Sequence, residues 1–220
     1  MGCDIHIWVE RLNYVGSGSS KRWEMVATED ATYHNRNYRL FSLLAGVRNN
    51  ARAAIKPISE PRGLPLDVSK EVATAMEDAG YHSKSWLTLG EIRAADLDTP
   101  QTYTGVVDAL NAARIFMGEQ PQAWSGDVFG RDIVFLEEKA MRAELEKHPG
   151  YWADLVYAPE TFELPSAAPG NLRNLRHRAT WKRPLSLDCE GFMKWLDVME
   201  DVAYWDSRRE EIRLVFAFDN

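Results

Sequence analysis

Two stretches of alternating polar and apolar residues lie at opposite ends of this chain, and they constrain its fold more than any other feature. From Asp4 to Leu12 the apolar side chains occupy every second position, and from Glu211 to Phe218 the same period of two returns. This period is typical of β-strands with one buried face. After the first stretch, VGSGSS supplies a turn and KRWEMVA a second short strand, so a hairpin is predicted near the N-terminus.

Between these strands the patterns are mainly helical. We predict helices over 37–50, 69–80, from Thr88 onward, 104–117, 137–148 and 188–204, and one further strand over 132–136. Thr88 and Glu91 form a capping box. Residues 158–184, with their Pro, Gly and Asn, resemble an extended surface excursion. The pattern predicts a single α+β domain over 1–220.

Strands at both termini with helices between them also predict how the sheet is built. We expect a central antiparallel sheet that includes the first and last strands, with several helices packed on it. If those two strands pair, Asp4 lies near Asp219. The N-terminal polar residues would then face the end of the last strand.

Composition excludes several classes of protein. The 220 residues are 45% hydrophobic, which suits a globular core. No stretch approaches the ~18 consecutive apolar residues of a membrane span, so we expect no membrane association and a cytoplasmic protein. The net charge of −7 argues against broad nucleic-acid binding. Residues 164–187, however, contain no acidic residue and several basic ones, which indicates either a solvated loop or a docking surface.

The first candidate site is the polar side of the opening strand, MGCDIHIWVE. Asp4 and His6 are two residues apart, so both side chains point the same way, roughly 7 Å from each other. A carboxylate and an imidazole can bind Mg²⁺, Mn²⁺ or Zn²⁺, or act as an acid–base pair. His82 is the third catalytic candidate. The alternative is a polar strand face on which His6 bonds to a neighbouring residue.

The second group of candidates would bind an anion. Ser83, Lys84 and Ser85 directly precede the predicted helix start at Thr88, where unpaired backbone N–H groups attract phosphate. The alternative is ordinary helix capping. In HNRNYR, Arg36 and Arg39 stand at the beginning of a helix, a position that suits a cation only if an anion lies there too.

Arg62 is the last anion candidate. Two prolines flank the Arg62-Gly63 pair in ISEPRGLPLDVS, and they stiffen the loop that presents the guanidinium. A fixed guanidinium suits a bidentate contact with phosphate or carboxylate. The alternative is a structural turn in which Arg62 pairs with Glu60 or Asp67.

Several of these segments resemble a family of proteins encoded in bacteriophage genomes. The resemblance rests on MGCDIHIWVE, RNYRLF, PISEPRGLPLDVS, HSKSWLTLGEI and the closing VFAFDN. It covers roughly the first 95 residues and the last ten. It implies action inside an infected bacterium, and it assigns no catalytic role to any residue.

Two functional hypotheses follow. The first is a phage protein that binds a phosphate-bearing small molecule, in particular a nucleotide, and hydrolyses it with a metal-activated water, in nucleotide metabolism or against host defence. The second is a non-catalytic anti-defence protein that sequesters a nucleotide signal or inhibits a host defence protein by surface binding.

Overall fold

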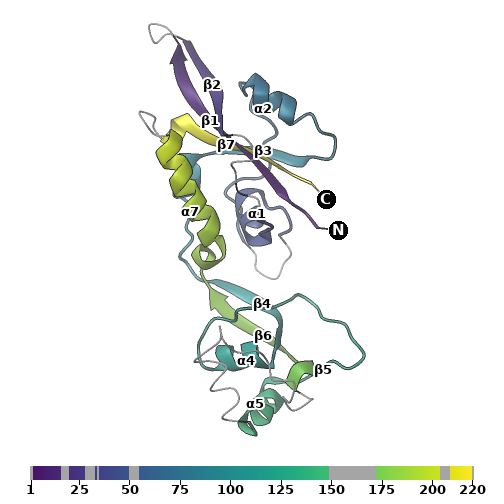
Figure 1. Cartoon of the computed structure of the whole chain (residues 1–220). Helices are drawn as coiled ribbons and strands as arrows, with labels where there is room; N and C mark the ends of the chain where they lie inside the picture. Colours follow the sequence, from purple (N-terminus) through teal and green to yellow (C-terminus); the bar gives the residue numbers. More distant parts are fainter. Residues whose placement is uncertain are drawn as a thin grey trace. The chain divides into compact units, whose positions relative to one another are not determined.

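The structure is a computed structural model that describes residues 2–15, 20–27, 33, 35–49, 55–148, 172–203 and 209–219. The chain divides into two compact units, coloured along the sequence in Figure 1. Unit 1 consists of Met1–Asn50, Ala54–Pro100 and Pro184–Asn220, and unit 2 of Ala51–Ala53 and Gln101–Arg183. The mixed α+β class is confirmed. The single-domain expectation stays a prediction.

Unit 1 contains a four-stranded antiparallel sheet. Its strands, in the order β2-β1-β7-β3, are Ser20–Ala27, Ile5–Val15, Ile212–Phe218 and His82–Thr88. The predicted hairpin and the predicted pairing of the first and last strands are both confirmed, with Ile5 opposite Phe218 and Arg11 opposite Ile212. The two strands lie side by side at the centre of the sheet in Figure 1.

The helices of unit 1 are α1 (Tyr38–Ala45), α2 (Lys70–Ala75), α3 (Leu89–Arg93) and α7 (Leu185–Ala203), with a short 3-10 turn η3 at Arg209–Glu211. On one face of the sheet, Phe41 of α1 packs against Phe218 of β7, with ring centroids 5.1 Å apart. Phe192 and Leu196 of α7, which lie in the predicted helix over 188–204, are fully buried.

Strand β1 is buried on both faces, whereas its alternation predicts one. Ile5, Ile7 and Val9 form the expected apolar face. On the other face, Trp8 is only 3% exposed, because α2 packs Val72 onto it together with residues of β7. Glu10 is also fully buried on this second face. A helix far along the chain therefore covers side chains that the local pattern leaves to solvent.

Unit 2 contains a three-stranded sheet in the order β4-β6-β5. Its strands are β4 (Gln101–Asp108), β5 (Val134–Phe135) and β6 (Leu175–Arg183), and its helices α4 (Ala109–Phe116) and α5 (Glu138–Glu146), with a 3-10 turn η2 at Leu172–Asn174. Strand β6 pairs antiparallel with β4 and parallel with β5.

Two predictions in unit 2 are wrong. Residues 104–108, predicted as the start of a helix, belong to β4, and the helix begins only after Asp108, whose side chain accepts from the Asn111 N–H. The β-branched pair Val106 and Val107 suits a strand once β6 lies beside it. Residues 175–183, predicted within a surface excursion, form the central strand of this sheet. Of the rest of that excursion, residues 172–174 form η2, and residues 158–171 lie outside the described residues.

Candidate functional site

The first and last strands of the sheet bring Asp4 and Asp219 together, as the sequence predicts. The backbone N–H of Asp4 donates to Oδ1 of Asp219 over 3.1 Å, and the Asp219 N–H donates to the Asp4 carbonyl over 3.2 Å. The second of these bonds joins the two backbones and continues the β1–β7 ladder by one residue, whereas the first fixes the Asp219 side chain. The Asp219 carboxylate is therefore held at a defined position beside the N-terminal strand.

His6 shares this end of the sheet. Its Nε2 lies 3.2 Å from Oδ2 of Asp219, and its side chain is 18% exposed. The ring packs against Tyr81, with centroids 4.7 Å apart, and stacks on Trp8. A carboxylate on one ring nitrogen orients an imidazole and stabilises its protonated form, which is how enzymes prepare histidine for proton transfer. The predicted pair of Asp4 and His6 thus gains a third member in Asp219.

Arg36 completes this group through two hydrogen bonds to the Asp4 carboxylate. Its Nε and Nη2 donate to the two carboxylate oxygens of Asp4 over 2.8 and 2.6 Å, and the guanidinium holds the pKa of Asp4 below its ordinary value. Gly2 lies so close that a Cβ there would overlap the guanidinium. A residue without a side chain at this position therefore allows the Arg36 contact.

We call Asp4, His6, Arg36 and Asp219 the sheet-end cluster. Among the residues that the structure describes, no group of three or more His, Cys, Asp and Glu side chains is arranged to hold a metal ion. The carboxylate of Asp4 is engaged by Arg36, so a metal would have to displace that guanidinium. The predicted metal role of Asp4 and His6 stays a prediction.

Arg62 binds an anion that belongs to the protein itself. Its Nη1 and Nη2 donate to the carboxylate of Glu91 over 3.0 and 2.6 Å, while its guanidinium lies 4.9 Å from the centre of the Trp86 ring. Neither predicted alternative partner, Glu60 or Asp67, takes this place. The buried Ser85 hydroxyl accepts from the Arg62 backbone N–H over 3.1 Å.

The N-terminus of α3 uses the same carboxylate. Glu91 accepts from the Thr88 N–H over 2.8 Å, and Thr88 Oγ1 accepts from the Glu91 N–H over 3.1 Å, so the predicted capping box is confirmed. The helix start that the sequence marks as an anion site is thus filled by Glu91. Arg62 and Ser85 accordingly have structural partners, and their role in binding a ligand stays a prediction.

Removing the charge of Glu91 should change the stability of the fold in a pH-dependent way. The Arg62 hydrogen bonds lower the pKa of Glu91 in the folded state, so the ionised carboxylate stabilises the fold above its unfolded pKa of about 4.3. This stabilisation disappears as the pH falls through the lower folded-state value. We expect Glu91→Gln to be less stable than the wild type at neutral pH and to approach it below about pH 4 in urea denaturation.

The exposed Glu77 provides the control for that measurement, because it makes no side-chain ion pair among the described residues. Glu77→Gln removes the same charge and should leave the stability difference near zero at both pH values. A Glu91→Gln deficit that stayed constant from neutral to acidic pH would contradict the role of the ionised carboxylate.

His82 is separated from the sheet-end cluster by the sheet. Strand β3 pairs His82 with Phe218, opposite Ile5, whereas His6 pairs with Ala217. Neighbouring residues of a strand point to opposite faces, so His6 and His82 lie on different faces. The three predicted catalytic residues therefore do not meet. The Nε2 atom of His82 is buried without a hydrogen-bond partner in the described part of the chain.

The residues after His82 belong to β3, a strand that was not predicted from the sequence. Ser83 has a positive φ of 51° where the register shifts, and its hydroxyl lies 3.0 Å from Nδ1 of His82. Lys84 donates to the Met76 carbonyl at the end of α2. Arg39 lies in the first turn of α1, which Asn37 caps through the Arg39 and Leu40 N–H groups. The predicted anion contacts are thus distributed over several places.

A buried ion pair further along β1 and β7 was not predicted. Glu10 of β1 stands opposite Arg213 of β7, and Arg213 Nε donates to Glu10 Oε2 over 2.7 Å. The other oxygen of Glu10 accepts from the Ser69 N–H, and Arg213 Nη1 donates to Asp67. The Glu10 and Arg213 side chains are 0% and 2% exposed. The sequence does contain a signal for this pair, because one acidic and one basic residue lie in two strands that are predicted to pair.

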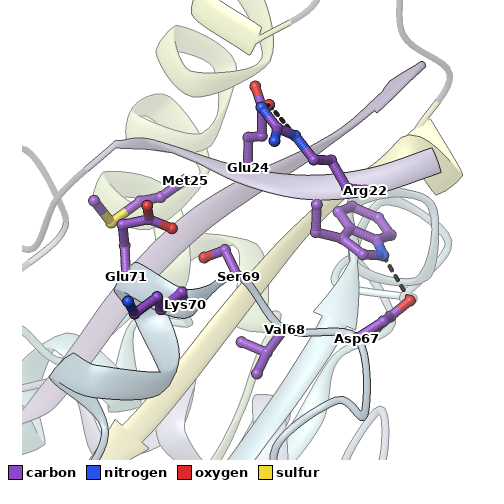
Figure 2. Close-up of a pocket in the computed structure, with 9 residues that line it drawn as sticks. Arg22, Glu24, Met25, Asp67, Val68, Ser69, Lys70 and Glu71 are labelled. Atoms are coloured by element: carbon purple, nitrogen blue, oxygen red, sulfur yellow. Dashed lines mark hydrogen bonds and ion pairs between the residues drawn. The ribbon is translucent and has the colours of Figure 1, made fainter. Parts of the chain in front are cut away.

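Arg213 also organises the wall of a groove beside strand β2, shown in Figure 2. Its guanidinium lies 3.9 Å from the centre of the Trp23 ring, and the indole N–H of Trp23 donates to Asp67 over 2.9 Å. The groove has a volume of about 600 Å³. It is lined by Arg22, Trp23, Glu24, Met25, Asp67, Val68, Ser69, Lys70 and Glu71. Three carboxylates and two cations give this lining an excess of negative charge.

The comparisons with known proteins add no relative. No family model, no curated protein and no solved structure matches this chain. No helix of the described residues has the length and apolar character that crossing a membrane requires. The functional conclusion accordingly rests on the geometry of the sites.

Proposed function

We propose that this protein binds a phosphate-bearing small molecule, in particular a nucleotide, at the sheet-end cluster. The observation that carries the proposal is the meeting of an arginine–carboxylate pair and a histidine–carboxylate pair at one end of the sheet. Asp4 joins the two pairs, because its carboxylate grips Arg36 while its backbone N–H donates to Asp219. The Arg36 guanidinium, which would bind the ligand, and the His6 imidazole, which would transfer a proton, are therefore held by two carboxylate residues that are hydrogen-bonded to each other.

Arg36 is the group that would receive the phosphate. Its side chain is 51% exposed, and no described residue accepts from its Nη1 group. A guanidinium binds phosphate oxygens through paired N–H donors. The groove beside β2 is less suited to this ligand, because its lining carries more negative than positive charge.

His6 and Asp219 would perform the chemistry in a hydrolytic version of the site. His6 would accept the proton of an attacking water, and Asp219 would stabilise the imidazolium that forms. In the alternative version expected from the sequence, Asp4 and His6 would instead hold a divalent metal, which would supply the activation of the water in place of a general base. The resemblance to phage proteins supports a role inside an infected cell, where loss of a nucleotide signal would weaken host defence.

The test is a panel of cyclic and linear nucleotides, incubated with the protein alone and with Mg²⁺, Mn²⁺ or Zn²⁺. After denaturation, chromatography and mass spectrometry identify what was bound and whether it changed. A new product supports hydrolysis. A ligand recovered unchanged supports sequestration, the non-catalytic alternative. No binding and no product across the panel would overturn the proposal.

Single substitutions separate binding from turnover. We expect Arg36→Gln to weaken nucleotide binding about tenfold or more, because charge-assisted hydrogen bonds contribute roughly 1.5–3 kcal/mol. His6→Gln should retain binding and lose about 10²–10⁴-fold of any turnover, the usual contribution of a general base. Binding is measured by calorimetry and turnover by product formation.

Arg22→Gln is the matched control, since Arg22 is an exposed arginine paired with Glu24 in the same sheet. It should bind and turn over nucleotide like the wild type. Equal losses in Arg22→Gln and Arg36→Gln would show that the effect comes from net charge and would contradict a site at Arg36.

A further inference from the structure

The exposed face of strand β6 carries a row of positive charge. Arg176, Arg178 and Lys182 occupy alternate positions of the strand and share the face that is open to solvent, with Thr180 between them. The intervening residues His177, Ala179 and Trp181 are all at most 6% exposed. The alternation of the strand therefore places these basic residues of the sequence in one row on the exposed face.

The neighbouring strand β4 extends this face with hydroxyl groups. Thr102 lies opposite Lys182 and Thr104 opposite Thr180, and the hydroxyls of Thr104 and Thr180 are 3.2 Å apart. Threonine hydroxyls and basic side chains are the groups that contact phosphate oxygens in complexes with nucleic acids. We call Arg176, Arg178, Thr180 and Lys182 with Thr102 and Thr104 the β6 basic face.

The positive charge on this face is only weakly neutralised. Arg178 approaches Asp127 at 3.3 Å, but both side chains are about half exposed, and such surface pairs contribute little. Arg176 donates to the backbone carbonyls of Arg173 and Leu175, while Asp108, opposite it in β4, accepts from Asn111. Lys182 has no ion-pair partner among the described residues. The basic side chains of this face can therefore pair with the phosphates of a polyanion.

We propose that the β6 basic face binds the phosphate backbone of double-stranded DNA. Alternate residues of a strand are roughly 7 Å apart, so the row places Arg176 and Arg178 one such step apart and Lys182 two steps further along the same line. A linear polyanion with regularly spaced phosphates complements such a row. The net charge of −7 opposes the approach of DNA to the protein as a whole, whereas residues 164–187 contain no acidic side chain and make the charge around β6 locally positive.

The placement of the aromatic residues favours a duplex over a single strand. Proteins that bind single strands stack the bases on exposed aromatic rings. In this sheet Tyr103 and Trp181 are 0% and 6% exposed, and they stack on one another on the face opposite the cations. A duplex keeps its bases stacked internally and needs only backbone contacts, which depend on charge and not on sequence.

The experiment is fluorescence anisotropy of a labelled DNA duplex titrated with the full chain. We expect binding at about 50 mM salt that weakens by about 40-fold at about 200 mM, as neutralisation of three phosphates requires. Arg178→Ala/Lys182→Ala should weaken binding about tenfold or more at the lower salt, and each lost cation should lower the salt slope by about 0.9.

Lys139→Ala/Lys147→Ala provides the control, because it removes two exposed lysines from α5 and its C-cap in the same unit. This variant should bind like the wild type. No binding of the duplex at low salt, or equal losses in the two double variants, would overturn the proposal. Tighter binding of the single strand, of duplex RNA or of polyglutamate than of duplex DNA would also overturn it.

Discussion

Arg213→Met should destabilise the protein by about 3–5 kcal/mol, because it leaves the Glu10 carboxylate buried without its cation. Arg213 is 2% exposed and contacts Glu10, Asp67 and the ring of Trp23. Methionine fills a similar volume but donates no hydrogen bond. Urea denaturation followed by far-UV circular dichroism measures the loss, and a change in Trp23 fluorescence should accompany it.

The double variant Glu10→Leu/Arg213→Met is the decisive comparison. It removes both charges, so the desolvation penalty of the unpaired carboxylate disappears, and we expect it to recover more than half of the lost stability. Ser69 then loses the acceptor of its N–H, which limits the recovery. A double variant less stable than Arg213→Met would contradict this explanation, because it would show that the unpaired Glu10 carboxylate is not the source of the loss.

Trp181→Ala should remove about 3–5 kcal/mol of stability from unit 2, the usual cost of truncating a large aromatic core residue. The Trp181 ring stacks on Tyr103 at 5.9 Å and meets Trp124 edge-on at 5.4 Å. Gly105 lies beneath these rings, where a Cβ would be 3.2 Å from Trp181. Hydrogen exchange of the β4 and β6 amides, measured by mass spectrometry, reports the loss.

Trp181→Phe is the control for this effect. It keeps most of the ring and removes a buried indole N–H that has no acceptor among the described residues, so it should cost less than about 1.5 kcal/mol. Similar losses for both variants would contradict a packing role for Trp181. The same exchange data test the single-domain expectation, which requires the amides of β1 and β7 to lose equal protection.

The sequence predicts the parts of the fold that depend on nearby residues. The β1–β2 hairpin follows from two alternating runs around a Gly- and Ser-rich turn. The capping box at Thr88 follows from two residues three positions apart. The pairing of the terminal strands, and with it the approach of Asp4 and Asp219, follows from a simple topological rule.

The predictions that failed concern strands whose partners are distant in the chain. Residues 82–88 precede a predicted helix start and carry no strand prediction, although they form β3, which pairs with β7 more than a hundred residues away. Strand β6 lies in a basic segment and pairs with β4, whose residues 104–108 are predicted as the start of a helix. In both cases the hydrogen bonds of a sheet outweigh weak local preferences.

The candidate sites divide in the same way. By itself the sequence determines that Asp4 and His6 share one side of a strand, because the period of a strand is a local property. Only the tertiary structure decides that Asp219 contacts His6 and that Arg36 pairs with Asp4. It also decides that His82 lies on the other face and that Glu91 is the anion of Arg62. The reason is that the partner of a charged side chain depends on which distant elements pack together, and that packing is a property of the tertiary structure.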